Sequence, residues 1–138
     1  MWTIGGWAVN NPPVTPEPGS DLERLGEARV RRLVHTFMER VFADPMIGFF
    51  FQGKSLPRLR ELEARFALAH LGGGDDVYTG RPLDHAHAAL RIFDAHFDRR
   101  TTLLRETLIE DGVDTDIVQR WLAHTEAQRA LVIAGSCR

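Results

Sequence analysis

The sequence predicts an all-α domain of short, unequal helices. Apolar residues recur at helical spacing in several segments, and these segments are separated by Gly, Pro or Asp residues. No segment alternates between apolar and polar residues as a half-buried strand would, and no internal repeat is present. The length of 138 residues suits a single domain with its own hydrophobic core.

The composition argues against several other classes of protein. Hydrophobic residues make up 43% of the chain and charged residues 26%, as in ordinary globular proteins. The formal net charge of −2 offers no electrostatic reason to expect nucleic acid or an anionic membrane as a partner. Neither a membrane-spanning run nor a signal peptide is apparent, and the single Cys137 provides neither a disulfide framework nor a cysteine-based zinc site. We therefore expect a soluble, cytoplasmic protein.

The first 19 residues predict an irregular N-terminal arm. They contain four of the seven prolines of the chain and show little periodicity. Helical segments follow in residues 20–135, which we expect to form the domain. At its start, Ser20 or Asp21 offers an N-cap for a short helical turn that ends at Gly26.

Two amphipathic segments predict the next helices. Apolar residues over 30–42 predict a helix that ends at Asp44, because the proline that follows disfavours helical geometry in the residue before it. The patch over 47–51 is too aromatic for an exposed loop. A further helix is expected over 55–71, ended by the glycines of 72–74. Its expected apolar stripe consists of Leu59, Leu62, Phe66 and Ala69.

Three more helices are expected in the second half of the chain. A short helix begins near Pro82, a longer one spans about 94–111, and Thr115 starts the last one. The expected core side of the 94–111 helix consists of Phe93, Phe97, Leu104 and Leu108. The last helix carries Ile117, Val118, Trp121, Leu122 and Val132.

One histidine stands out by its position on a helix. His87 shares the apolar side of the short helix with Leu83 and Leu90, whereas His85 points about 200° away. The two rings therefore diverge, which disfavours a zinc pair. His87 is either a core histidine with satisfied nitrogens or the single axial ligand of a haem, and the residue alone leaves both interpretations open.

One carboxylate also occupies an unusual position. Glu63 lies four residues after Leu59 and three before Phe66, on or beside the apolar stripe of its helix. In one interpretation it is an edge residue that pairs with Arg60 or reaches solvent. In the other it lies in a pocket, where desolvation would raise its pKa and equip it for proton transfer.

A set of short segments carries a family resemblance through its order and spacing. The segments are residues 37–44, 49–51, 58–59, 71–73, 78–80, 86–90, 94–97 and 112–113. Together they resemble the truncated haemoglobins, the two-over-two globin family, and are nearest to its group I, over roughly residues 21–135. The resemblance implies a two-over-two helical sandwich that encloses a haem.

The resemblance also implies roles for single residues. His87 falls on the proximal histidine that ligates the haem iron, and the absence of a Cys-x-x-Cys-His motif predicts that haem b is held non-covalently. Phe51 falls on a phenylalanine that stacks on the haem, Tyr78 lies near its edge, and Phe97 lies behind it. The complete set of expected haem contacts is Phe51, Leu59, Leu62, Phe66, Tyr78, Leu90 and Phe97.

The departures from the family pattern lie on the distal side of the haem. Met38 stands where the family usually has a tyrosine that donates a hydrogen bond to bound oxygen, and a thioether cannot donate one. Glu63 stands where the family often has glutamine or an apolar residue, and Leu59 and Leu62 supply no distal imidazole. The distal pocket is therefore expected to be atypical, and oxygen storage is a weaker expectation than for most relatives.

Three functions are compatible with this pattern. The first is a haem protein that binds oxygen, nitric oxide or another small gaseous ligand, with a reductase as partner and roles such as oxygen binding or transport. The second is a haem enzyme with redox activity, dioxygenase or peroxidase-like, in which Glu63 acts as acid and base. The third is a sensor or interaction module in which the arm contacts a partner.

Overall fold

The computed structural model of the chain describes residues 13–74 and 92–134, and these residues form a stack of helices without strands. The elements are α2 (Asp21–Leu25), α3 (Glu27–Ala43), the 3-10 turn η1 (Gly48–Phe51), α4 (Leu56–Leu68), the π-helical turn η2 (Ala69–Gly73), α6 (Asp94–Glu110), α7 (Thr115–Ala127) and α8 (Arg129–Ala134).

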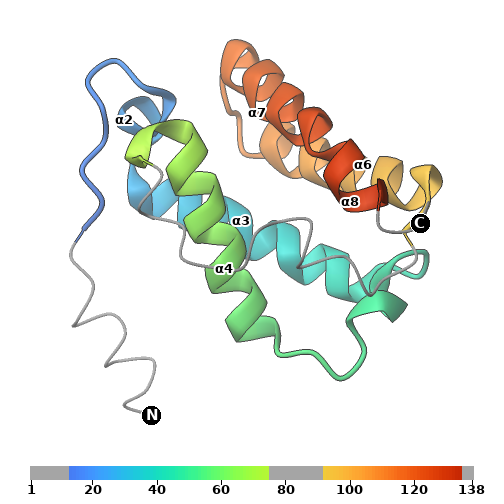
Figure 1. Cartoon of the computed structure of the whole chain (residues 1–138). Coiled ribbons are helices and arrows are strands. Elements are labelled where there is room, and N and C mark those ends of the chain that lie inside the picture. The colour runs from blue at the N-terminus through green and yellow to red at the C-terminus, as the bar shows by residue number, and fades with distance from the viewer. Residues whose placement is uncertain (1–12, 75–91, 135–138) are drawn as a thin grey trace.

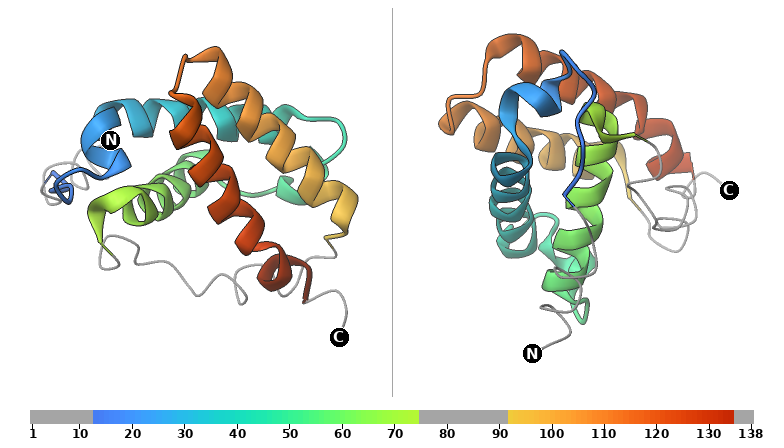
Figure 2. Two further views of the ribbon diagram at one scale, coloured as in Figure 1. Left: turned by 90° about the horizontal axis from the view of Figure 1, so that it is seen from above. Right: turned by 90° about the vertical axis from the view of Figure 1, so that its left-hand side faces the viewer.

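The four long helices form two layers. Helices α3 and α4 cross each other, and the antiparallel pair α6 and α7 packs beside them (Figures 1 and 2). This arrangement confirms the all-α, two-over-two fold expected from the sequence. Helix α3 lies in contact with both α4 and α6, so it forms the centre of the sandwich.

Local signals in the sequence place the helix ends. The Ser20 Oγ accepts a hydrogen bond from the Glu23 N–H at 3.2 Å, and the Ser55 Oγ accepts one from the Arg58 N–H at 3.2 Å, so both act as N-caps. Gly26 ends α2 with a positive φ of 86°, and α3 stops at Asp44. The last predicted helix differs, because it is interrupted at Gln128 between α7 and α8.

The core lies between the layers. Its largest fully buried side chains are Phe37, Leu22, Leu68, Leu108, Ile117, Val30, Val34 and Val41. The expected core residues Phe97, Leu104 and Leu108 of α6 are buried. The prediction for Phe93 is wrong, because this residue forms the N-cap of α6 and its side chain is 55% exposed.

The aromatic patch is also partly exposed. Phe51 packs on the ring of Phe42 with the centroids 4.9 Å apart, but Phe49 is 52% exposed and contacts Phe50 and His96. The prediction of a covered segment therefore holds for Phe51 and fails for Phe49.

The described part of the N-terminal arm is irregular and fastened to the domain. The Val14 N–H donates to Glu27 Oε1 at 2.8 Å, and the Glu17 N–H donates to the Gly72 carbonyl at 2.8 Å. Gly72 has a φ of 136°, and a Cβ there would overlap with Ser20. A glycine is therefore required where η2 meets the arm.

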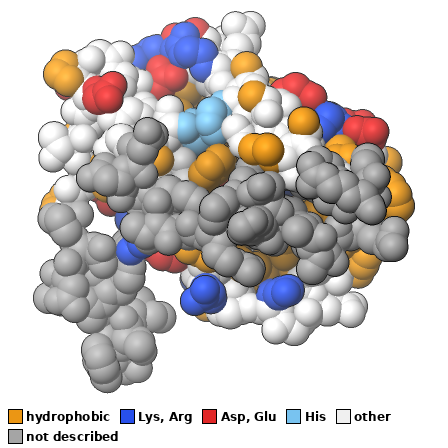
Figure 3. Space-filling model, viewed as in Figure 1, with side chains coloured by type: hydrophobic (Ala, Val, Ile, Leu, Met, Phe, Trp, Pro, Cys, Tyr) orange, Lys and Arg blue, Asp and Glu red, His pale blue; other side chains and the backbone are white. Residues whose placement is uncertain are grey.

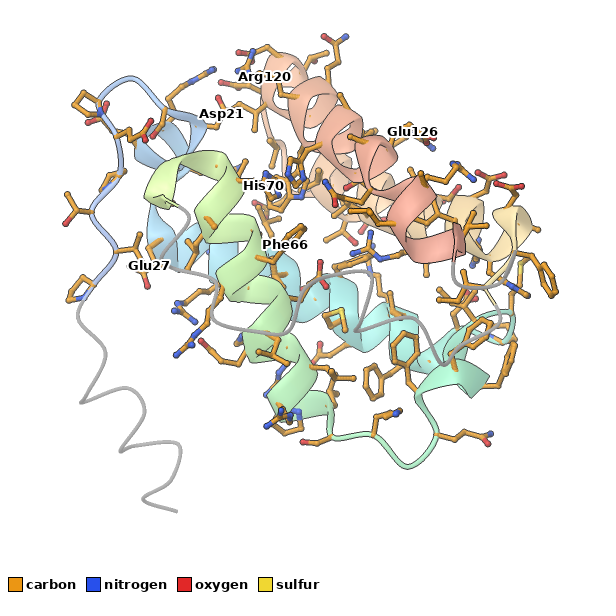
Figure 4. All side chains as sticks on the ribbon, viewed as in Figure 1. Asp21, Glu27, Phe66, His70, Arg120 and Glu126 are labelled. Carbon is orange, nitrogen blue, oxygen red and sulfur yellow. The ribbon has the colours of Figure 1, made fainter. Side chains whose placement is uncertain are left out.

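Charged contacts tie distant segments together. Arg120 of α7 donates to both carboxylate oxygens of Asp21, at 2.8 and 2.9 Å, across the contact between α2 and α7 (Figure 4). At the end of α3, the buried Asp44 accepts hydrogen bonds from Arg99 of α6 and from the N–H groups of Met46 and Ile47. These hydrogen bonds, chiefly the one from Arg99, hold the pKa of Asp44 below its usual range.

Over the ranges 13–74 and 92–134, none of the helices has the length and apolar character needed to cross a bilayer.

Candidate functional site

Helix α4 has two apolar faces, and only one of them forms part of the main core. Ala64, Ala67 and Leu68 are buried, with exposed fractions of 0–2%, where α4 packs on α3. The stripe predicted from the sequence lies on the opposite side of the helix, about 170° around from this face. Its members Leu59, Leu62, Phe66 and Ala69 are only half-buried. Leu59, Leu62 and Phe66, three of the expected haem contacts, therefore lie on the face of α4 that points away from α3.

An ion pair lies at one edge of this second face. The Arg100 Nη2 of α6 donates a hydrogen bond to the Glu63 Oε2 of α4 at 2.8 Å. The two side chains are 29% and 28% exposed, so neither is freely solvated. A carboxylate with such a partner is a strong hydrogen-bond acceptor held in a defined place.

The partner of Glu63 differs from the one expected. The Arg60 Nη1 lies 3.6 Å from the Glu39 Oε2, and the Arg65 Nε lies 3.6 Å from the Glu61 Oε2. Both neighbouring arginines of α4 therefore have other carboxylates beside them. The structure therefore brings Glu63 to a cation from another helix and not to one from its own.

Arg100 is held by a third helix as well. Its guanidinium carbon lies 5.0 Å from the ring centroid of Phe37 of α3, which is only 1% exposed. A guanidinium over an aromatic face gains a cation–π attraction. Arg100 is thus positioned by α3, α4 and α6 together.

The sequence contains a signal for Arg100, although Arg100 was not among the predicted site residues. Arg100 lies three residues after Phe97 and four before Leu104, which are both buried residues of α6. A charged residue at this spacing falls on the apolar stripe of the helix. Glu63 occupies the same kind of position on α4, and two opposite charges on the apolar stripes of two helices indicate a pair.

The structure describes some of the other predicted site residues. Met38 of α3 is 5% exposed within the main core, and Phe97 is 2% exposed in a smaller cluster with Ile92. Phe51 and Leu59 pack partly against the main core. The remaining predicted residues, which are His87, Tyr78 and Leu90, lie outside the described residues, as does His85.

An aromatic cluster joins the end of α4 to α7. The His70 ring stacks on that of His124 with centroids 3.8 Å apart and an angle of 12°, and Phe66 and Trp121 contact this pair. Figure 4 shows Phe66 and His70 on the side of α4 that faces α7, and the same view in Figure 3 shows histidine beside hydrophobic side chains there. Burial, together with the neighbouring His124, lowers the pKa of His70 to about 3.

The composition of the second face of α4 fits a haem. Cofactor sites are lined mainly by apolar side chains with a few placed polar groups. Leu59, Leu62 and Phe66 provide the apolar part, and the Glu63–Arg100 pair provides the polar part. Haem is a flat and largely apolar group with a polar iron centre, so these residue types suit it.

Comparisons with known proteins agree with this assignment. The family model of the bacterial-like globins matches residues 22–132. The group 1 truncated hemoglobin GlbN of Mycolicibacterium paratuberculosis is 33% identical over 107 residues, which cover 77% of this chain and 78% of the relative. That of Synechocystis sp. is 35% identical over 101 residues, which cover 70% and 81%.

Solved structures show the same relationship. The 2/2 hemoglobin of Synechococcus sp. PCC 7002, in its cyanomet state with covalently attached heme, superimposes with a TM-score of 0.79 and 28% identity. The alignment covers 84% of this chain and 99% of that one. The truncated hemoglobin of Tetrahymena pyriformis, in its Fe(III) form, gives a TM-score of 0.73 with 28% identity and coverages of 83% and 97%. The chain therefore belongs to the bacterial-like globins, as a truncated haemoglobin of the group 1 type, whose cofactor is haem.

Proposed function

We propose that this chain holds haem b non-covalently through His87 and binds a small ligand, such as oxygen or nitric oxide, at the iron. The observation that supports this function is the second apolar face of α4, with Leu59, Leu62 and Phe66 beside one ion pair. The proximal role of His87 rests on its position in the family pattern and on its place between Leu83 and Leu90 in the sequence.

The distal side is built from the residues of α3, α4 and α6. Met38 cannot donate a hydrogen bond, and Leu59 and Leu62 carry no polar atom in their side chains. Glu63 and Arg100 are then the polar groups of this side. Haem supplies the iron that binds the ligand and changes oxidation state, and the expected partner is a reductase that keeps it ferrous.

The test is a haem titration of the purified protein, followed by absorption spectra of the ferric, ferrous and carbon monoxide forms. We expect one haem per chain and a mainly five-coordinate ferrous spectrum, because α4 offers no imidazole at Leu59 or Leu62. A six-coordinate, low-spin ferrous spectrum that persists in Met38→Leu would show that another side chain ligates the iron.

Two variants test the proximal residue. His87→Gly should lose most of the haem, whereas the matched variant His85→Ala should retain it, because two residues at this spacing on the helix that the sequence predicts would point about 200° apart. Equal haem loss in both variants would contradict the assignment of His87. A folded protein that takes up no haem at all would refute the proposed function as a whole.

A further inference from the structure

We infer that Arg100 is a specificity-determining residue that makes this site bind small inorganic anions, and that Glu63 limits their affinity by competing for the same guanidinium. The inference rests on the proposed function, since it assigns a ligand class to the same haem site. It concerns two side chains that the structure places in direct contact.

The position of Arg100 favours the binding of an anion. Arg100 lies on the apolar stripe of α6, between Phe97 and Leu104, and its guanidinium reaches the second face of α4 at Glu63. Leu59, Leu62 and Phe66 of that face are apolar. The guanidinium is therefore a partly buried cation over the ring of Phe37, where its attraction for an anion is less screened than at a fully exposed surface.

The Arg100 side chain is also held rigidly. A free arginine side chain loses much rotamer freedom when it binds a ligand. Arg100 is already held by the ring of Phe37 at 5.0 Å and by the Glu63 carboxylate at 2.8 Å. The Arg100 side chain therefore loses much of its conformational entropy when the protein folds. Binding an anion to it costs less conformational entropy than binding one to a mobile arginine.

The Arg100 guanidinium also has hydrogen-bond donors to offer to an anion. A guanidinium carries five N–H donors in a planar fork, and among the residues that the structure describes its hydrogen bond is the one from Nη2 to Glu63. Over the ranges 13–74 and 92–134, the other N–H groups of the fork are therefore available to an acceptor. An anion gains a charge-assisted hydrogen bond from them, whereas a neutral ligand such as carbon monoxide gains little.

Glu63 opposes the binding of an anion through its charge. Glu63 neutralises Arg100 in the pair and repels an incoming anion. Glutamine at the same place would keep the shape and remove the charge. The anion affinity of the Glu63–Arg100 pair is therefore lower than that of Arg100 without Glu63, and higher than that of a site without Arg100.

The experiment measures dissociation constants of azide and fluoride for the ferric protein, and of carbon monoxide for the ferrous protein, by absorption titration. The variants are Glu63→Gln, Arg100→Met and the double variant. The matched control is Arg105→Met, which removes an exposed arginine from the same helix. Haem content and the thermal unfolding midpoint of each variant establish that it is folded and loaded.

We expect Glu63→Gln to bind both anions at least about tenfold more tightly than the unchanged protein does. The double variant should bind them at least about tenfold more weakly than Glu63→Gln, which is the effect expected for the loss of one charge-assisted hydrogen bond. Arg100→Met should bind anions more weakly than the unchanged protein. The affinity of each variant for carbon monoxide should stay within about twofold of that of the unchanged protein, because carbon monoxide is neutral and gains little from Arg100. Arg105→Met should keep its affinities for the anions and for carbon monoxide within the same range, because it leaves Arg100 in place.

The comparison of Glu63→Gln with the double variant is decisive, because both lack the carboxylate and they differ only at Arg100. Equal anion affinities in these two variants, with normal haem content and carbon monoxide binding, would overturn the inference and leave the proposed function intact. Failure of the unchanged protein to bind haem would instead refute the proposed function.

Discussion

The stacked pair of His70 and His124 makes the stability of this protein depend on pH. The His70 ring is enclosed by His124, Phe66 and Trp121, and burial is the main cause that lowers its pKa from an ordinary value of 6.5 to about 3. Further lowering comes from the positive charges of a protonated His124 and of Arg100. The folded protein therefore holds His70 neutral over the whole range from neutral pH down to this value.

The sign of the effect follows from proton linkage. Below pH 6.5 the unfolded chain binds a proton on His70 that the folded protein does not bind, so acid favours unfolding. The stabilisation by neutral His70 is complete above pH 6.5 and is lost as the pH falls toward 3. At pH 4.5, two pH units below the unfolded value, the loss is at most about 3 kcal/mol, at about 1.4 kcal/mol per unit.

The assay is urea unfolding at pH 7 and pH 4.5, monitored by helical circular dichroism. His70→Phe keeps an aromatic ring in the stack and removes the titrating group. The free energy of unfolding of both proteins should fall between pH 7 and pH 4.5, but the fall in His70→Phe should be about 2–3 kcal/mol smaller than in the unchanged protein. Glutamates also begin to titrate near pH 4.5, but they are present in both proteins, so the difference between the two proteins reports on His70.

Phe66→Leu is the matched control, because it alters the same cluster without removing a titrating group. The free energy of unfolding that Phe66→Leu removes, relative to the unchanged protein, should be the same at pH 7 and at pH 4.5. If the unchanged protein and His70→Phe lose equal free energy between pH 7 and 4.5, His70 is not a neutral, buried group in the folded protein, and the reasoning is refuted.

Three further predictions concern stability at neutral pH and use the same urea assay. Asp44→Ala removes a buried acceptor of side-chain and backbone donors and should cost about 2–4 kcal/mol. The control Glu106→Ala, at an exposed position of α6, should change stability by less than about 0.5 kcal/mol, and equal losses would contradict the role of Asp44. Gly72→Ala should cost about 1–3 kcal/mol, because the backbone is left-handed and Ser20 occupies the space of the new methyl group, and an unchanged midpoint would disprove this. Phe37→Ala should cost about 3–5 kcal/mol, since the ring is 1% exposed, and a loss below about 1 kcal/mol would show that the core closes around the gap.

Much of the fold follows from local sequence signals. Ser20, one of the two expected N-cap residues, caps α2, and Asp44 before its proline ends α3, as the sequence predicts. These signals are short-range, because a cap or a proline acts on the backbone of its own turn. The order and spacing of short motifs also identified the family, which the comparisons confirm. The haem contacts assigned to His87, Tyr78 and Leu90 stay predictions.

The sequence by itself therefore determined most of the helices that the structure describes and the family with its haem cofactor, whereas the helix expected near Pro82 lies outside the described residues. Only the tertiary structure decided which face of α4 is buried, because two apolar stripes lie on this helix and the crossing with α3 selects the one with small residues, Ala64 and Ala67. It also decided the partner of Glu63. Arg100 is 37 residues away in the chain, and only the packing of α6 against α3 and α4 brings its guanidinium to the carboxylate. Local spacing on one helix carries no information about the angle at which another helix arrives.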